Sequence, residues 1–166
     1  MPAESSAVEP EEQYDAVVYA GDSSRVLYRA TGEFGSPLSG FLDVIRLVVR
    51  DSATWRAVWA RLVAPDVRRP PPAVEPPLVD FARELVIVAA QGPAFCASGV
   101  SIDTVYRIRH SAIGVAVVRT FRALGGCGCL AYSRAPAIAV RLPLDRVELI
   151  RFAERPPVDN CRGAVP

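Results

Sequence analysis

The side chains best suited to chemistry in this sequence are four cysteines, all in its second half. An even number of cysteines in a proline-rich chain favours disulfides and an oxidising compartment. Cys127 and Cys129 are two residues apart, so on a strand they face the same side and are poorly placed to bond each other. Cys96 and Cys161 are the available partners, and three pairings are open. We expect Cys127 or Cys129 to pair with Cys161, which ties the C-terminal segment to a sheet.

The same sulfurs allow other chemistry. They could be unpaired buried thiols, and a four-thiolate zinc or iron site is disfavoured because the chain has no Cys-x-x-Cys pair. Cys96 and His110, the only histidine, could act as nucleophile and base. No third group at a recognisable spacing orients the imidazole, and we expect His110 to lie in an exposed hairpin turn. The sequence therefore predicts no catalytic residues, no metal site and no cofactor.

The charged residues exclude several classes of protein. All 19 basic residues are arginine, so the chain lacks the lysine of a Walker loop, a Schiff-base enzyme or a protein kinase. A formal net charge of +1 gives no field for nucleic acid or an anionic membrane. No apolar run approaches the roughly 18 residues of a membrane span. The partner that we expect is therefore neither nucleic acid nor bilayer.

Length and composition predict one domain. The chain has 166 residues, 51% of them hydrophobic, which is enough for one sizeable core. Residues 1–13 are acidic and small, and we expect a disordered tail there, followed by a single domain over 14–166. The first six residues lack the basic and apolar regions of a signal peptide. Two interpretations stay open: an exported mature chain with an added start methionine, or a protein that is never exported.

The apolar pattern predicts mostly strands and one helix. Residues 41–50 alternate as a strand, and 85–90 are continuously apolar, as in a central strand covered on both faces. A helix follows Ser52, the expected N-cap, and ends at Pro65. Its apolar stripe consists of Trp55, Val58, Trp59, Leu62 and Val63.

Three pairs of apolar runs predict hairpins: residues 16–20 with 26–30, residues 100–109 with 113–117 around His110-Ser111, and residues 137–142 with 146–153. The expected fold is α+β and mainly β. It is a single antiparallel sheet or a sandwich-like domain, with one amphipathic helix packed on it.

Surface loops are the candidate binding sites. Residues 65–77 hold six prolines, so we expect a stiff extended loop that loses little entropy on binding and presents Arg68 and Arg69. The turn at Ser98 and Gly99 is the second candidate, because loops on a rigid sheet commonly carry recognition. For both, an inert connection is the alternative.

Two pairs of residues could instead bind or cleave a carbohydrate. Trp55 and Trp59 could form a sugar platform, but their place in the apolar stripe favours the core. Asp80 and Glu84 could act as paired acids. We interpret them as a loop cap and an edge charge.

Four stretches of residues 39–161 carry a resemblance. They are Ser39-Gly40 with Val44-Ile45-Arg46 and Trp55-x-x-x-Trp59; Val79-Asp80-Phe81 with residues 84–87; Ser98-Gly99 before Val100-Ser101-Ile102; and Cys129-Leu130, Pro136, residues 140–143, residues 151–154 and Cys161. Together they resemble the C-terminal domain of the protease-complex subunit PrcB, a family of bacterial envelope and secreted proteins. Where that family usually shows Thr-Gly-Gly-Tyr, this chain lacks the second glycine and the tyrosine. The resemblance implies an extracytoplasmic location and binding or stabilisation of a protease, with no catalytic residues.

Our sequence-based hypothesis is a non-enzymatic extracytoplasmic module that binds a protein, with a protease as the expected partner. Two alternatives from other classes are a small thiol enzyme that uses Cys96 and His110, and a β module that binds a small ligand.

Overall fold

The computed structural model describes residues 14–19, 26–29, 39–64, 75–95, 99–108, 110–122, 133–143 and 147–159. Within these ranges the chain forms β1 (Tyr14–Tyr19), β2 (Val26–Arg29), β3 (Ile45–Val49), α1 (Ser52–Leu62), β4 (Glu84–Ala90), β5 (Ala94–Phe95), β6 (Gly99–Ile108), β7 (Ile113–Arg122), β8 (Ser133–Arg134), β9 (Ala137–Pro143) and β10 (Leu149–Asp159).

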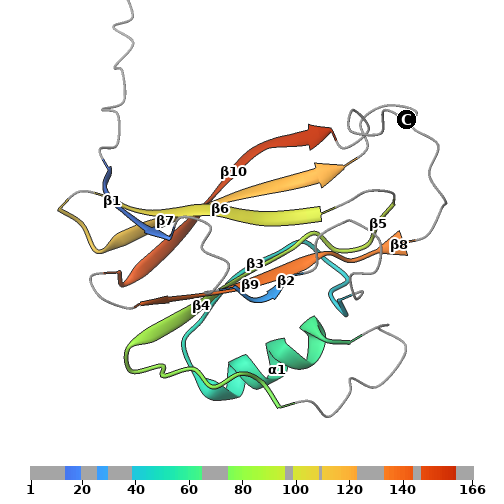
Figure 1. The fold of residues 1–166 in the computed structure, drawn as a ribbon, viewed down its shortest axis with the longest axis horizontal. Helices are drawn as coiled ribbons and strands as arrows, with labels where there is room; N and C mark the ends of the chain where they lie inside the picture. The colour runs from blue at the N-terminus through green and yellow to red at the C-terminus, as the bar shows by residue number, and fades with distance from the viewer. Residues whose placement is uncertain are drawn as a thin grey trace, which may run out of the picture.

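The strands build a sandwich with the helix on one side (Figure 1). Sheet A has the order β1-β6-β7-β10, sheet B has the order β2-β9-β4-β3, and β5 pairs with β8. All pairs are antiparallel except β10 with β7, which run parallel. The prediction of a mainly β, α+β fold is confirmed, and of its two forms the sandwich is the one observed.

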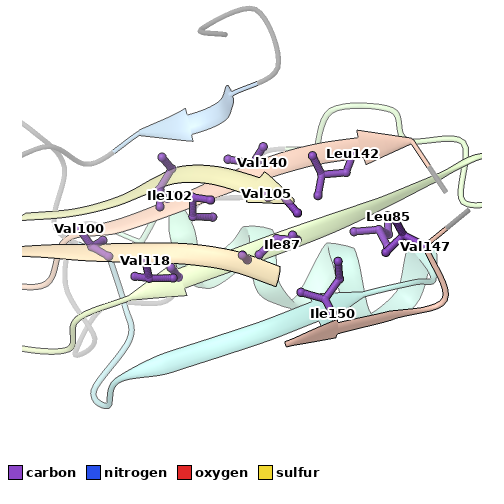
Figure 2. Packing of buried hydrophobic residues seen from close by; sticks show 13 residues of the cluster. Leu85, Ile87, Val100, Ile102, Val105, Val118, Val140, Leu142, Val147 and Ile150 are labelled. Carbon is purple, nitrogen blue, oxygen red and sulfur yellow. The ribbon is translucent and has the colours of Figure 1, made fainter. Parts of the chain in front are cut away.

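The continuous apolar run of β4 is explained by its two buried faces. Leu85 and Ile87 point into the layer between the sheets, whereas Val86 and Val88 point towards α1. A strand covered on both faces needs apolar residues at every position rather than at alternate ones. Figure 2 shows the layer between the sheets, where side chains from β4, β6, β7 and β9 meet.

The helix packs its predicted stripe on the outer face of sheet B. Trp55 and Trp59 are 2% and 8% exposed, and their ring centroids are 5.4 Å apart. Nε1 of Trp55 donates to the carbonyl oxygen of Pro77 at 3.0 Å, so this tryptophan is a core residue and not a sugar platform. The N-cap is Asp51, not the predicted Ser52, because the Asp51 carboxylate accepts the Thr54 N–H at 2.8 Å.

Two of the three predicted hairpins are wrong, and each error has the same cause. β1 pairs with β6 in sheet A, while β2 pairs with β9 in sheet B. Likewise β9 belongs to sheet B, and β10 crosses to sheet A, where it runs beside β7. In each case the two runs belong to opposite sheets, so they do not pair with each other as a hairpin requires.

The third hairpin is confirmed. β6 and β7 pair antiparallel along their length, and His110 lies in the turn with a φ of 57°. Its side chain is exposed there, as expected. The predicted strand over 41–50 is shorter and covers Ile45–Val49, with Ile45 and Leu47 against the helix layer and Val48 against the layer between the sheets.

Candidate interaction surface

The outer face of sheet A is the face that points away from sheet B. Val100, Ile102 and Val105 of β6 point inward into the core, so the alternate residues of β6 and their partners on β7 and β10 point outward. Among the described elements, none packs on this face, whereas α1 covers the far side of sheet B (Figure 1).

A β-bulge in β6 changes which of the strand's side chains point outward on this face. Ile102 pairs with Val118, but Thr104 pairs with Val117, so β6 takes two steps where β7 takes one. Asp103 is the extra residue, and a bulge of this kind bends the strand and redirects its side chains. Strict alternation from Ile102 predicts Thr104 inward, whereas the bulge turns it outward.

Asp103 is the centre of a polar cluster drawn from three strands. Its Oδ2 accepts from Nε of Arg119 on β7 at 2.7 Å and from Arg155 on β10 at 3.5 Å. Ser101 donates its hydroxyl to Oδ1 at 2.8 Å. The Asp103 and Arg119 side chains are 22% and 29% exposed, and Arg155 is 46% exposed. The cluster therefore stays in contact with solvent while residues from three successive strands of the sheet hold its geometry.

The middle of this face is more buried than its rim. Thr104, Val115 and Val117 are 7%, 7% and 8% exposed, whereas Arg151 and Arg155 are exposed. Among the described residues of this face, these charged side chains are therefore more accessible to solvent than the middle of the face.

The predicted binding residues are placed as follows. Arg68, Arg69 and Ser98 lie outside the described residues. Gly99 is the first residue of β6 and is buried, paired with Phe121 of β7. Gly99 thus starts a strand and presents no side chain to a partner.

The strand ends next to the predicted disulfides lie at the same end of the sandwich, on the right in Figure 1. Phe95 pairs with Ser133, and Arg122 pairs with Asp159. The first cysteine follows Phe95 directly, the middle two lie between Arg122 and Ser133, and the last comes two residues after Asp159. The cysteines themselves lie outside the described residues: Cys96, Cys127, Cys129 and Cys161.

The alternative thiol enzyme gains no support from this topology. Gly99 begins the ten residues of β6, and His110 lies beyond their other end, which separates the two residues by roughly 30 Å at the rise of a strand. Cys96 lies outside the described residues, and the described residue that follows it, Gly99, is thus at the far end of β6 from the imidazole.

The paired acids have structural roles. The Asp80 carboxylate accepts the backbone N–H of Ala82 at 3.1 Å and caps a turn, as expected. Glu84 lies on the inner strand β4 rather than at an edge, and pairs with Arg141 of β9 at 3.2 Å. The two carboxylates thus bind separate partners within the chain.

Asp103, Arg119 and Arg155 were not predicted as a site.

No protein-family model, curated protein or solved structure matches this chain. The resemblance to the PrcB family therefore stays a prediction from the sequence. Over the described ranges, no helix is long and apolar enough to cross a membrane, and no three side chains of metal-ligand type gather into a site.

Proposed function

We propose that this chain is a non-enzymatic protein-interaction module that works outside the cytoplasm and binds or stabilises a protease. The observation that carries the proposal is the outer face of sheet A. Strands on a packed core hold Arg119 and Arg155 in place there, and rigid positioning lowers the entropic cost of binding. Arginine is also among the residues enriched at protein interfaces.

The protease and the location come from the sequence. The resemblance to the PrcB family points to a protease partner, and the even set of four cysteines favours an oxidising compartment. The disulfides themselves are inferred from the cysteine count, and each of them requires Cα atoms within about 7 Å.

Affinity capture from the envelope fraction of the source organism tests the partner. We expect the folded chain to retain a protease, and the purified protease to slow hydrogen exchange in β6, β7 and β10 but not in α1. Failure to retain any protease, or protection confined to α1, contradicts the proposal. Catalytic turnover by the chain that is lost in His110→Ala contradicts it as well.

Mass spectrometry of the unreduced chain tests the compartment. Each disulfide removes two hydrogens and blocks two thiols from alkylation, so we expect no alkylation of the four cysteines before reduction. Four reactive thiols in protein purified from its native source contradict the extracytoplasmic location.

A further inference from the structure

The outer face of sheet A carries several arginines. Among the residues whose side chains the structure describes, its outward positions hold Arg119, Arg151 and Arg155, and one carboxylate, Asp103, contacts Arg119 and Arg155. The whole chain has a formal net charge of only +1. The pairing of two arginines with one carboxylate is therefore a local feature and not a consequence of the overall composition.

Two of these arginines are direct neighbours on adjacent strands. Arg155 of β10 is the register partner of Arg119 of β7, and like charges placed side by side on a sheet repel each other. Both guanidinium groups contact the same Oδ2 of Asp103, at 2.7 and 3.5 Å. One carboxylate therefore balances two cations, and the group of three keeps one positive charge.

The guanidinium groups have donors beyond those contacts. Arg119 uses Nε and Arg155 uses one terminal nitrogen towards Asp103, and each guanidinium carries five N–H donors. Arg155 is 46% exposed and Arg119 is 29% exposed. A second carboxylate can approach from solvent, accept from both groups and neutralise the remaining charge.

We propose that Arg119 and Arg155 form a docking site for an acidic segment of a protein partner, with one Asp or Glu side chain bound between them. This inference rests on the proposed function and adds the chemistry of the partner. Charge complementarity favours a carboxylate because the residual charge is a single positive one. A nucleic acid is disfavoured because its affinity depends on neutralising many phosphates.

Titration with a synthetic ten-residue oligoglutamate, with oligoglutamine as the neutral probe, tests the site. We expect oligoglutamate alone to shift the NMR signals of the Arg119 and Arg155 side-chain N–H groups, with an affinity that falls as salt rises. Arg155→Gln should weaken binding about threefold. Its matched control is Arg56→Gln, which removes an equal charge from an exposed position on the opposite side, on α1.

Asp103→Asn supplies a test of opposite sign. Loss of the internal carboxylate leaves two uncompensated guanidinium groups, so the affinity for oligoglutamate should rise about threefold or more. Circular dichroism tests whether the Asp103→Asn variant folds. If it does not fold, Ser101→Ala replaces it, because this variant keeps both charges of the Asp103–Arg119 pair. With Ser101→Ala, the affinity should stay within about twofold of the native chain.

Equal losses in Arg155→Gln and Arg56→Gln overturn the proposal, as does tighter binding of a single-stranded oligonucleotide than of oligoglutamate. The protease capture experiment separates this inference from the proposed function. If the chain retains a protease equally well with Arg155→Gln and Arg155→Glu, the module binds its partner elsewhere and the arginine site is wrong. If no protease is retained but oligoglutamate binds between the arginines, the proposed function fails and the site stands.

Discussion

The outer faces of the two sheets differ in the charged residues that they carry and in what covers them. On sheet B, Val86 and Val88 are fully buried beneath α1. On sheet A, Arg119 and Arg155 flank Asp103 with their side chains partly in solvent. The apolar side chains of both faces are buried, whereas the charged side chains on sheet A stay partly in solvent. The comparison assigns stability to the helix layer, and our proposal places recognition on the opposite side.

Truncation of Trp55 should have the largest effect on stability. Trp55 is 2% exposed and its indole N–H donates to Pro77. Trp55→Ala should lower the free energy of unfolding by about 3–5 kcal/mol, measured by urea denaturation. Arg56→Ala, an exposed neighbour on the same helix, should stay within about 0.5 kcal/mol. A loss of unfolding free energy in Trp55→Ala that is no larger than the small loss in Arg56→Ala would show that the helix layer does not stabilise the fold.

A methyl group added between the sheets should have the next largest effect. A Cβ on Gly114 would lie 2.7 Å from Cδ1 of Ile150 and 3.1 Å from Cγ1 of Val147. Gly114→Ala should therefore destabilise the chain by about 1–3 kcal/mol through overpacking. Ile150→Val removes the closest methyl, so the double variant should recover part of the loss in a double-mutant cycle. Strict additivity would contradict the packing shown here.

The polar cluster of sheet A should contribute less to stability than either apolar layer. Arg119→Gln removes a 2.7 Å ion pair whose side chains are 29% and 22% exposed, and should cost about 1 kcal/mol. The control is Arg83→Gln, whose ion pair with Asp80 is 3.8 Å long and mostly exposed, with a change near zero. A loss as large as that of Trp55→Ala would make the cluster a structural element and not a recognition surface.

Replacement of Asp51, the N-cap of α1, should have the smallest effect on stability, and this effect should depend on pH. Hydrogen bonds from Thr54 lower the pKa of Asp51 below its ordinary value of 3.8. Because the folded pKa is the lower one, the charged cap stabilises the chain above the ordinary pKa and loses this effect as pH falls through the folded pKa. Asp51→Asn keeps an acceptor oxygen without the charge. The difference in melting temperature between native chain and variant should shrink on acidification, and a constant difference would contradict the assignment.

The sequence predicted the features that depend on near neighbours. The α1 stripe, the double burial of β4 and the β6–β7 hairpin around His110 follow from local periodicity, and the structure confirms all three. The cluster on sheet A could not be predicted in this way. Asp103 is 16 residues from Arg119 and 52 from Arg155, and only the bulge and the parallel pairing of β10 with β7 bring them together.

Taken alone, the sequence determined the mainly β class, the helix after residue 51 and the exclusion of chemistry that requires lysine or several histidines. The tertiary structure decided which strands pair and which described side chains face solvent. The physical reason is that a short apolar run can cover a core equally well from either sheet. The sheet that it joins depends on the packing of distant strands, as the placement of β9 in sheet B and β10 in sheet A shows.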